Sequence, residues 1–374
     1  MYAQDWWIGS KSNCMRRFFP DRMKLEQIKT PALLVDLDAM ESNLHAMAEF
    51  FRDRKCKLRP HFKNHKTPLL AWKQIRAGAI GMTCATVREA EILVEHGINS
   101  ILIANEIAGQ EKPERIAELS RHASVIVAVD NCHSVRDLAA AQRSRKTQIE
   151  VLVDVNIGLD RCGVAAGQAA LDLARYAADH GLAVRGVMGY EGHLQAIPPS
   201  PERDAIVREG SKAIVETAAM LKSAGIDAAI VSTGGTGTYA AAGDYPGVTE
   251  IQAGSYLLMD NIYVSRRAPF QRSLTVLATV ISTRGTEHAV LDCGVKAVSG
   301  ERGLSTLKDL PGTTLTALHA EHALVQLDPS VAPALTPGQK VEVWVHYSDA
   351  TVNLHSLIYG VRHGQLEEVL KIEH

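Results

Sequence analysis

The feature that most constrains the fold is a regular alternation of short apolar runs with longer helical patterns between residues 31 and 232. The first helical pattern, 38–54, carries apolar side chains three or four residues apart, which is the period of an amphipathic helix. The runs that we interpret as strands are 32–35, 56–59, 80–84, 100–104, 125–129, 150–155, 184–190 and 228–232. Each of the first seven runs is followed by a helical segment.

Strict alternation of strands and helices predicts parallel strands, because each helix returns the chain to the same end of the sheet. Eight such units in roughly 220 residues match the size of a (β/α)8 TIM-type barrel. A doubly wound open sheet is the alternative, but no glycine-rich dinucleotide turn follows the first strand. In a barrel the functional side chains lie at the carboxyl ends of the strands, and polar residues follow nearly every strand here.

The pattern changes near residue 265. Short β-type runs at 273–282, 288–293, 313–318, 324–327 and 341–345 are separated by glycine and proline. They predict a second, mainly antiparallel β domain. We therefore expect a barrel domain at 31–265, a β domain at 266–374, and an N-terminal segment, 1–30, that packs on the β domain.

Composition limits the partners and the compartment. Hydrophobic residues make up 46% of the 374 residues and the net charge is −2, which gives no support for a nucleic-acid partner. No apolar run reaches the roughly 18 residues of a membrane helix, and residues 1–23 lack the apolar core of a secretory signal. The six cysteines form no CxxC pair, which favours free thiols in a reducing cytoplasm.

A basic stretch at 59–68, directly after the second strand, is the first candidate site. Its cationic side chains are His61, Lys63, His65 and Lys66. A lysine can form a Schiff base with an aldehyde cofactor when neighbouring cations lower its pKa. A solvated basic loop is the alternative, but prolines at both ends of the stretch stiffen it. Lys63 would then point at the barrel mouth.

A glycine-rich loop follows the eighth strand and is the second candidate site. It reads Thr233-Gly234-Gly235-Thr236-Gly237-Thr238. Backbone N–H groups at glycines can converge on an anion, and barrels often bind phosphate after their last strands. Gly254-Ser255-Tyr256 offers a second set of donors. The alternative is a tight glycine turn.

The runs Thr30-Pro31-Ala32-Leu33-Leu34-Val35-Asp36-Leu37-Asp38 and Arg59-Pro60-His61-Phe62-Lys63 resemble the D-threonine aldolase and D-serine dehydratase branch of the alanine racemase-fold enzymes. The resemblance extends from about residue 31 to about residue 364. It implies pyridoxal 5′-phosphate as the cofactor and Lys63 as the lysine that bonds to it. It also implies that Arg161 contacts the phenolic oxygen of the cofactor ring and that Tyr190 lies near that ring. A surface ion pair for Arg161 and a rim position for Tyr190 are the alternatives, and the role of His193 stays open.

The segment 346–355 is similar to the part of these enzymes in which a histidine and a nearby aspartate or cysteine hold a divalent metal. One residue usually separates the two ligands, but here that position is Ser348. We therefore expect His346 and Asp349 to be the ligands, and an oxygen donor favours Mg²⁺ or Mn²⁺ over Zn²⁺. A hydrogen-bonded His–Asp pair is the alternative. Glu321 and His322 could assist the metal or cap a strand.

The resemblance implies two outcomes for a β-hydroxy-α-amino acid. The leading hypothesis is an aldolase that cleaves D-threonine-like substrates to glycine and an aldehyde, with His61 taking the hydroxyl proton; His61 could equally be a packed core histidine. A D-serine or hydroxyaspartate dehydratase is second, and the lack of a cysteine beside His346 favours the aldolase. A racemase, with a second base such as Tyr263 or Tyr347, and a non-catalytic cofactor carrier are further alternatives. The family also implies a homodimer.

Overall fold

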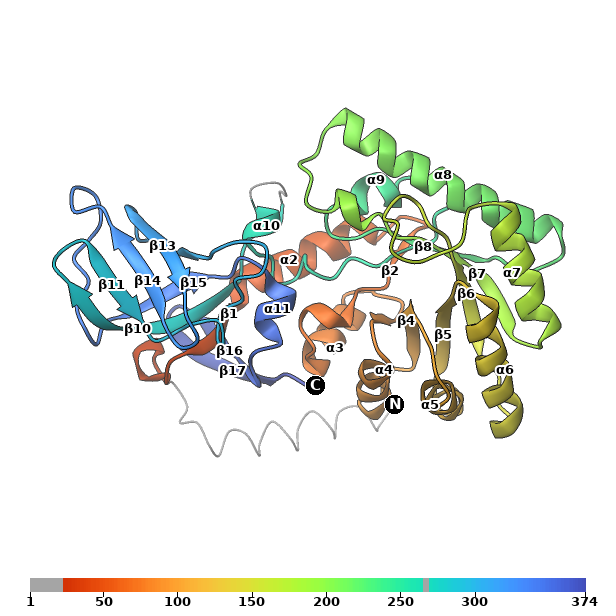
Figure 1. Ribbon diagram of the computed structural model, residues 1–374, viewed down its shortest axis with the longest axis horizontal. Coiled ribbons are helices and arrows are strands. Elements are labelled where there is room, and N and C mark those ends of the chain that lie inside the picture. Colours follow the sequence, from red (N-terminus) through yellow and green to blue (C-terminus); the bar gives the residue numbers. More distant parts are fainter. Residues whose placement is uncertain (1–22, 265–268) are drawn as a thin grey trace. The chain divides into compact units, whose positions relative to one another are not determined.

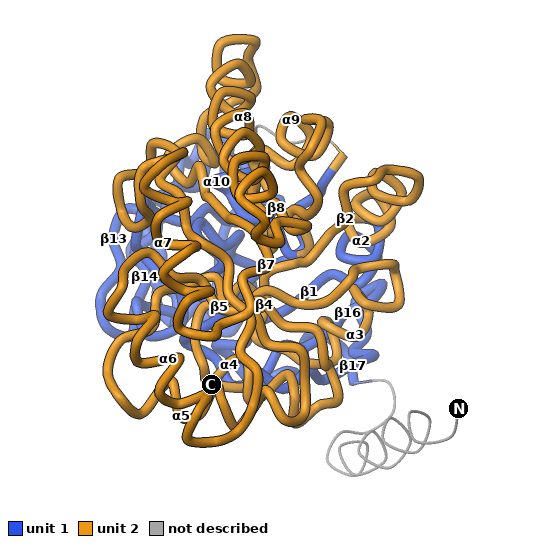
Figure 2. Tube along the Cα trace, turned by 90° about the vertical axis from the view of Figure 1, so that its right-hand side faces the viewer, with its two compact units in different colours: residues 1–42, 258–264, 270–372 blue, residues 43–257, 265–269, 373–374 orange. Residues whose placement is uncertain are grey.

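The chain folds into two compact units. The computed structural model describes residues 23–264 and 269–374. Unit 1 contains residues 23–42, 258–264 and 270–372, and unit 2 contains residues 43–257, 269 and 373–374 (Figure 2). Unit 1 is therefore built from both ends of the described chain. Within the described residues, no helix combines the length and apolar character needed to cross a membrane.

Unit 2 is a barrel of eight parallel strands (Figure 1). The hydrogen-bonded order is β2-β9-β8-β7-β6-β5-β4-β3, and a parallel bridge between His61 and Thr83 joins the two ends of this order. The strands are β2 (Lys57–Leu58), β3 (Met82–Cys84), β4 (Ser100–Glu106), β5 (Ser124–Val129), β6 (Glu150–Asp154), β7 (Ala183–Met188), β8 (Ile230–Thr233) and β9 (Glu250–Ile251). The predicted TIM-type barrel is confirmed.

Helices alternate with the barrel strands. They are α2 (Leu37–Phe51), which begins in unit 1, α3 (Pro68–Arg76), α4 (Val87–Glu95), α5 (Glu111–Leu119), α6 (Cys132–Arg145), α7 (Gln168–Asp179), α8 (Pro201–Ser223) and α9 (Tyr239–Gly243), with the short 3-10 helices η2 (Phe62–Asn64) and η3 (Gly192–Leu194). The first turn of α4 is capped, because the Thr86 hydroxyl accepts from the Glu89 N–H and the Glu89 carboxylate accepts from the Ala85 N–H. Apolar side chains of β4–β7 form a buried cluster that holds these strands together.

Unit 1 is built on a nine-stranded sheet. Its order is β13-β14-β11-β10-β1-β16-β17, and β15 pairs with β10 and β12. The strands are β1 (Ala32–Asp36), β10 (Leu274–Arg284), β11 (His288–Leu291), β12 (Thr306–Leu307), β13 (Thr313–Leu318), β14 (Ala323–Leu327), β15 (Lys340–Trp344), β16 (Leu357–Arg362) and β17 (Gln365–Lys371); the helices are η1 (Leu25–Gln27), α10 (Asn261–Val264) and α11 (Ser348–Val352). All described pairings are antiparallel except β1 with β16, so the expected antiparallel domain is confirmed.

One strand assignment was wrong. The run 32–35 was expected to be the first barrel strand, but β1 pairs with β10 and β16 in the sheet of unit 1. The eighth barrel strand is instead β9, which has two residues. A fully buried run such as β1 carries no period-2 signal to tell one sheet from another, and β9 is too short to show any period. The division between the units consequently differs from the expected boundary at residue 31.

The described part of the N-terminal segment lies along the β16–β17 hairpin of unit 1. The Leu25 N–H donates to the Gly364 carbonyl at 3.0 Å, and the Leu366 N–H donates to the Met23 carbonyl at 2.9 Å. Residues 1–22 of the expected segment lie outside the described residues.

Candidate active site

The basic stretch forms a short, well-anchored turn at the carboxyl end of β2. His61 precedes η2, and its Nδ1 accepts from the Lys63 N–H at 3.4 Å. Phe62 and Asn64 are buried, whereas Lys63 is half-buried. The turn ends at Lys66, whose φ of 49° is left-handed and whose carbonyl accepts from the Glu373 N–H. Lys63 therefore stands on a fixed backbone at a barrel strand end, as predicted.

Both histidines of this turn are neutral at physiological pH. Burial, followed by the charges of Lys63, His65 and Arg161, holds the pKa of His61 well below its usual value. Burial lowers the pKa of His65 to about 4, against the opposing effect of its hydrogen bonds with Gln74 and Thr67. In neutral His61 the one available lone pair is on Nδ1, where it accepts the long hydrogen bond from the Lys63 N–H, so His61 can take a proton there once that bond opens.

The glycine-rich loop after β8 folds onto two buried side chains of the loop after β7. The Thr233 hydroxyl donates to the Glu191 carboxylate at 3.0 Å, and the Thr238 hydroxyl donates to its other oxygen. Gln195 donates to Thr238 at 2.9 Å and accepts from the Gly237 N–H at 2.8 Å. Glu191 and Gln195 were missed in the sequence, although both follow a strand end as functional barrel residues do.

Close packing explains two of the glycines in this region. A Cβ at Gly235 would lie 2.6 Å from Gln195 Oε1, and a Cβ at Gly254 would lie 2.8 Å from the His61 carbonyl oxygen. The Tyr256 N–H donates to the Thr236 hydroxyl at 2.9 Å. The structure therefore brings the lysine turn, the loop after β8 and the segment 254–256 together.

The three members of the segment 254–256 have different surroundings. The Tyr256 side chain is fully buried, and its phenol oxygen accepts from the Gln74 amide at 2.9 Å. Ser255 is partly exposed, and its hydroxyl accepts from the Asn64 amide at 3.4 Å. Of this segment, Ser255 is the residue whose side chain can reach a bound anion.

Arg161 and Tyr190 follow β6 and β7 and line one small pocket at these strand ends. The Arg161 guanidinium carbon lies 5.9 Å from the centre of the Tyr190 ring. Arg161 is close enough to the lysine turn for its charge to lower the pKa of His61. His193 is exposed, and a Cβ at Gly158 would lie 3.1 Å from its ring.

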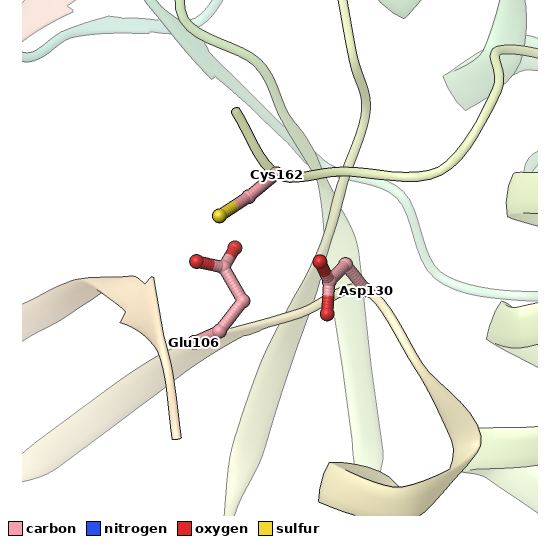
Figure 3. Close-up of side chains that lie close together, drawn as sticks. All are labelled: Glu106, Asp130 and Cys162. Carbon is pink, nitrogen blue, oxygen red and sulfur yellow. The ribbon is translucent and has the colours of Figure 1, made fainter. Parts of the chain in front are cut away.

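An acidic cluster adjoins the same pocket, which Glu106 and Cys162 line. Glu106, Asp130 and Cys162 offer ligand-type atoms within 4.8 Å of one another (Figure 3). Burial and the neighbouring Glu106 carboxyl raise the pKa of Asp154 to about 8, and burial with Glu106 raises the pKa of the Cys162 thiol to about 11. Asp154 therefore holds a proton near neutral pH and relieves part of the repulsion between these groups.

The expected metal ligands lie in unit 1, around the start of α11. Ser348 is fully buried, and its hydroxyl and N–H donate to one oxygen of the buried Asp260 carboxylate at 2.7 and 2.9 Å. Burial raises the pKa of Asp260 to about 6. His346 and Asp349 on either side are half-buried. The inward hydroxyl of Ser348 is thus committed to Asp260, a residue that sequence reasoning missed.

The neighbourhood of His346 is shaped by a glycine turn. A Cβ at Gly303 would lie 2.7 Å from His346 Nε2, and the Arg302 guanidinium lies 4.7 Å from the centre of the Tyr347 ring. Glu321 and His322 are exposed in the turn between β13 and β14, where Glu321 forms an ion pair with Lys296. Lys63 and the loops around it belong to unit 2, whereas His346 and Asp349 belong to unit 1.

Two family models match the chain. The alanine racemase N-terminal domain matches residues 35–262, and a putative serine dehydratase domain matches residues 273–361. D-threonine aldolase of Arthrobacter sp is 36% identical over 357 residues, which are 93% of each chain. D-threo-3-hydroxyaspartate dehydratase of Delftia sp. is 31% identical and covers 80% of this chain and 83% of its own.

A solved structure agrees with these matches. The crystal structure of D-threonine aldolase from Filomicrobium marinum is 35% identical and has a TM-score of 0.90 over 95% of this chain and 97% of its own. The barrel and the antiparallel domain are therefore shared along nearly the whole length. The chain belongs to the alanine racemase-fold family, in the branch of D-threonine aldolase and serine dehydratase-type enzymes.

Proposed function

We propose that this protein is a lyase that cleaves D-β-hydroxy-α-amino acids, such as D-threonine, to glycine and an aldehyde. Membership of the alanine racemase-fold family implies pyridoxal 5′-phosphate as its cofactor. We further propose that a divalent cation, Mg²⁺ or Mn²⁺ rather than Zn²⁺, is required. When bound, the cofactor would withdraw electrons from the substrate's Cα, and the cation would polarise a β-hydroxyl group.

The residues present in unit 2 fit the cofactor. Lys63 stands on η2, directly after strand β2, on a turn whose backbone is anchored at Lys66, which is a suitable place for an amine that bonds to an aldehyde cofactor. The loop after β8 and Ser255 adjoin this turn. The Thr236 and Ser255 hydroxyls each accept one hydrogen bond, so their own protons can be donated to a phosphate group, whereas the Thr233 and Thr238 hydroxyls donate to Glu191. Arg161 and Tyr190 lie close together after β6 and β7, the strands that come next to β8 in the barrel. A cationic group and a ring at this place can face an aromatic cofactor.

In this proposal the protein groups have separate tasks. Lys63 would hold the cofactor and, once the Cα–Cβ bond has broken, deliver one proton to the substrate's Cα. Neutral His61 would accept the β-hydroxyl proton while that bond breaks to give the aldehyde, and the proton added to Cα completes glycine. His346 and Asp349 hold the cation through one imidazole nitrogen and one carboxylate oxygen.

The observation that carries the choice of an aldolase is the 36% identity with a D-threonine aldolase over 93% of the chain. The geometry around Ser348 supports the choice of cation ligand. Its hydroxyl is buried and donates to Asp260, which favours the half-buried Asp349 carboxylate as the oxygen donor beside His346. The similarity to a hydroxyaspartate dehydratase supports the second candidate, elimination of water to give ammonia and a 2-oxo acid.

Product analysis separates the two candidates. The purified protein, loaded with pyridoxal phosphate and Mn²⁺, is given D-threonine, D-serine and D-threo-3-hydroxyaspartate in turn. Glycine and aldehyde in equal amounts are expected from D-threonine. A 2-oxo acid and ammonia without glycine would assign the dehydratase activity instead.

We also propose a cytoplasmic homodimer, as the family implies. Light scattering coupled to gel filtration measures the mass directly, and the chain mass of 40.6 kDa predicts about 81 kDa for twice that value. A mass of one chain at micromolar concentration would reject the dimer without affecting the assignment of Lys63.

A further inference from the structure

A chain of buried hydrogen bonds runs behind the lysine turn and starts at His65. His65 is fully buried, and its Nε2 lies 3.1 Å from the Gln74 amide oxygen. The Gln74 amide nitrogen donates to the Tyr256 phenol oxygen at 2.9 Å. The Tyr256 N–H in turn donates to the Thr236 hydroxyl at 2.9 Å. The four side chains are at most 3% exposed, so each bond lies away from bulk water.

The direction of this chain is fixed by its first member. The Thr67 N–H donates to His65 Nδ1 at 3.1 Å, so the neutral ring carries its proton on Nε2. That proton points at the Gln74 oxygen, which leaves the Gln74 NH₂ group to donate to Tyr256. A primary amide is suited to this place because it offers an acceptor at one end and a donor at the other.

Gln74 and Tyr256 lie beside a cavity of about 290 Å³ between α2, β2 and the end of α3, but they are at most 1% exposed. Packing therefore confines both side chains. The hydrogen bonds add direction to this packing, because they fix which end of the Gln74 amide faces His65 and which faces Tyr256.

The chain of bonds connects the two loops to which the proposed function assigns the cofactor. His65 belongs to the same turn as Lys63, and Thr236 belongs to the glycine-rich loop after β8. We propose that Gln74, on α3, is a positioning residue that sets the place of the Lys63 amine relative to the phosphate loop. This inference rests on the proposed role of Lys63 as the residue that bonds to the cofactor. It assigns a positioning role to a residue of α3, which carries none of the other proposed site residues.

The test replaces Gln74 with methionine, which keeps the length of the side chain and removes both bonds. Displacing a reacting group by a fraction of an ångström to 1 Å costs roughly tenfold to a hundredfold in rate. For Gln74→Met we expect kcat to fall by that factor with KM changed less than about threefold, because the group is displaced rather than removed. We also expect the pH midpoint of the visible absorbance of the cofactor-loaded protein to shift, since the surroundings of the Lys63 amine change.

The matched control is Gln252→Met. The Gln252 amide is also buried in the barrel and donates to the Ser232 hydroxyl at 2.9 Å, but it takes no part in the chain from His65. Both variants lose a buried amide, so similar losses in melting temperature are expected. Only Gln74→Met is expected to shift the absorbance titration.

Tyr256→Phe decides the matter if Gln74→Met does not fold. It removes one oxygen, keeps the ring and breaks only the link to Gln74, and we expect a smaller shift in the same direction. An unchanged titration in both variants, or an equal shift in Gln252→Met, would overturn the role of Gln74. Absence of any visible band in the unmodified protein would instead overturn the assignment of Lys63, and with it the proposed function.

Discussion

The two candidate regions of this molecule are supported in different ways. In unit 2 the lysine turn and the glycine-rich loop are tied to buried polar partners at many points, among them Glu191, Gln195 and Gln74. In unit 1 a single buried carboxylate, Asp260, turns Ser348 inward and leaves His346 and Asp349 partly exposed.

The difference agrees with the tasks proposed for the two regions. A covalently held cofactor needs one fixed amine and one fixed anion site, whereas a cation can draw flexible ligands into its own geometry. Substitutions should therefore act through covalent attachment and alignment in unit 2 and through metal affinity in unit 1.

The largest effect should come from Lys63→Ala. Without the amine no bond to the cofactor aldehyde can form, so we expect the visible absorbance to vanish and kcat to fall by about 10⁴-fold or more. Borohydride reduction followed by peptide mapping should label Lys63 in the unmodified protein and leave the variant unlabelled. A label on another lysine, such as Lys66, would show that the wrong amine of the turn has been assigned.

A pair of neighbouring substitutions tests the unit 1 region. Asp349→Ala removes the proposed carboxylate ligand, so we expect Mn²⁺ affinity and activity at limiting Mn²⁺ to fall by about a hundredfold. Ser348→Ala removes the hydroxyl that donates to Asp260 and should cost stability, about 1 kcal/mol, with a much smaller loss of affinity. Titration calorimetry with Mn²⁺ compares them. If Ser348→Ala lost more Mn²⁺ affinity than Asp349→Ala, Ser348 would be the ligand, and its hydrogen bond to Asp260 would not exclude it from binding the cation.

A smaller effect is expected from the glycine beside His346. Gly303→Ala places a Cβ 2.7 Å from His346 Nε2, so we expect about a tenfold loss of Mn²⁺ affinity as the ring is pushed aside. Gly338→Ala is the control, since both glycines have a positive φ but the Cβ at Gly338 meets open space. Both variants should lose stability through backbone strain, and equal affinities for Mn²⁺ would show that the contact with His346 does not matter.

The sequence predicted those parts of the fold and site that have a local signature. Lys63 and the loop at 233–238 were found because each follows an apolar strand and carries an unusual local composition. Gln74, Glu191 and Asp260 were missed because each is a single polar residue whose hydrogen-bond partners are distant in the sequence. The partners of Gln74 lie 9 and 182 positions away, those of Glu191 lie 42 and 47 positions away, and Ser348 lies 88 positions from Asp260. The misplaced first strand has the same cause, since the partners of β1 are near the other end of the chain.

The smallest predicted effect concerns stability and arises in the acidic cluster of unit 2. Asp154 keeps its proton up to about pH 8 in the folded protein, because of burial and the Glu106 carboxyl, whereas an unfolded aspartate loses it near pH 4. The folded state binds more protons between these values, so the free energy of unfolding should fall as the pH rises through this window.

Asp154→Asn keeps a donor towards Glu106 and carries no charge, so it should be more stable than the unmodified protein at pH 8–9 by about 1–3 kcal/mol and similar to it near pH 5. Urea unfolding at pH 5, 7 and 9 measures this, with the exposed Asp53→Asn as a control that should not change the slope. If the free energy of unfolding changed with pH equally in Asp154→Asn and in the unmodified protein, Asp154 would not be the group that holds the extra proton. The carboxylates at these strand ends would then be charged in the folded protein, contrary to what their burial indicates.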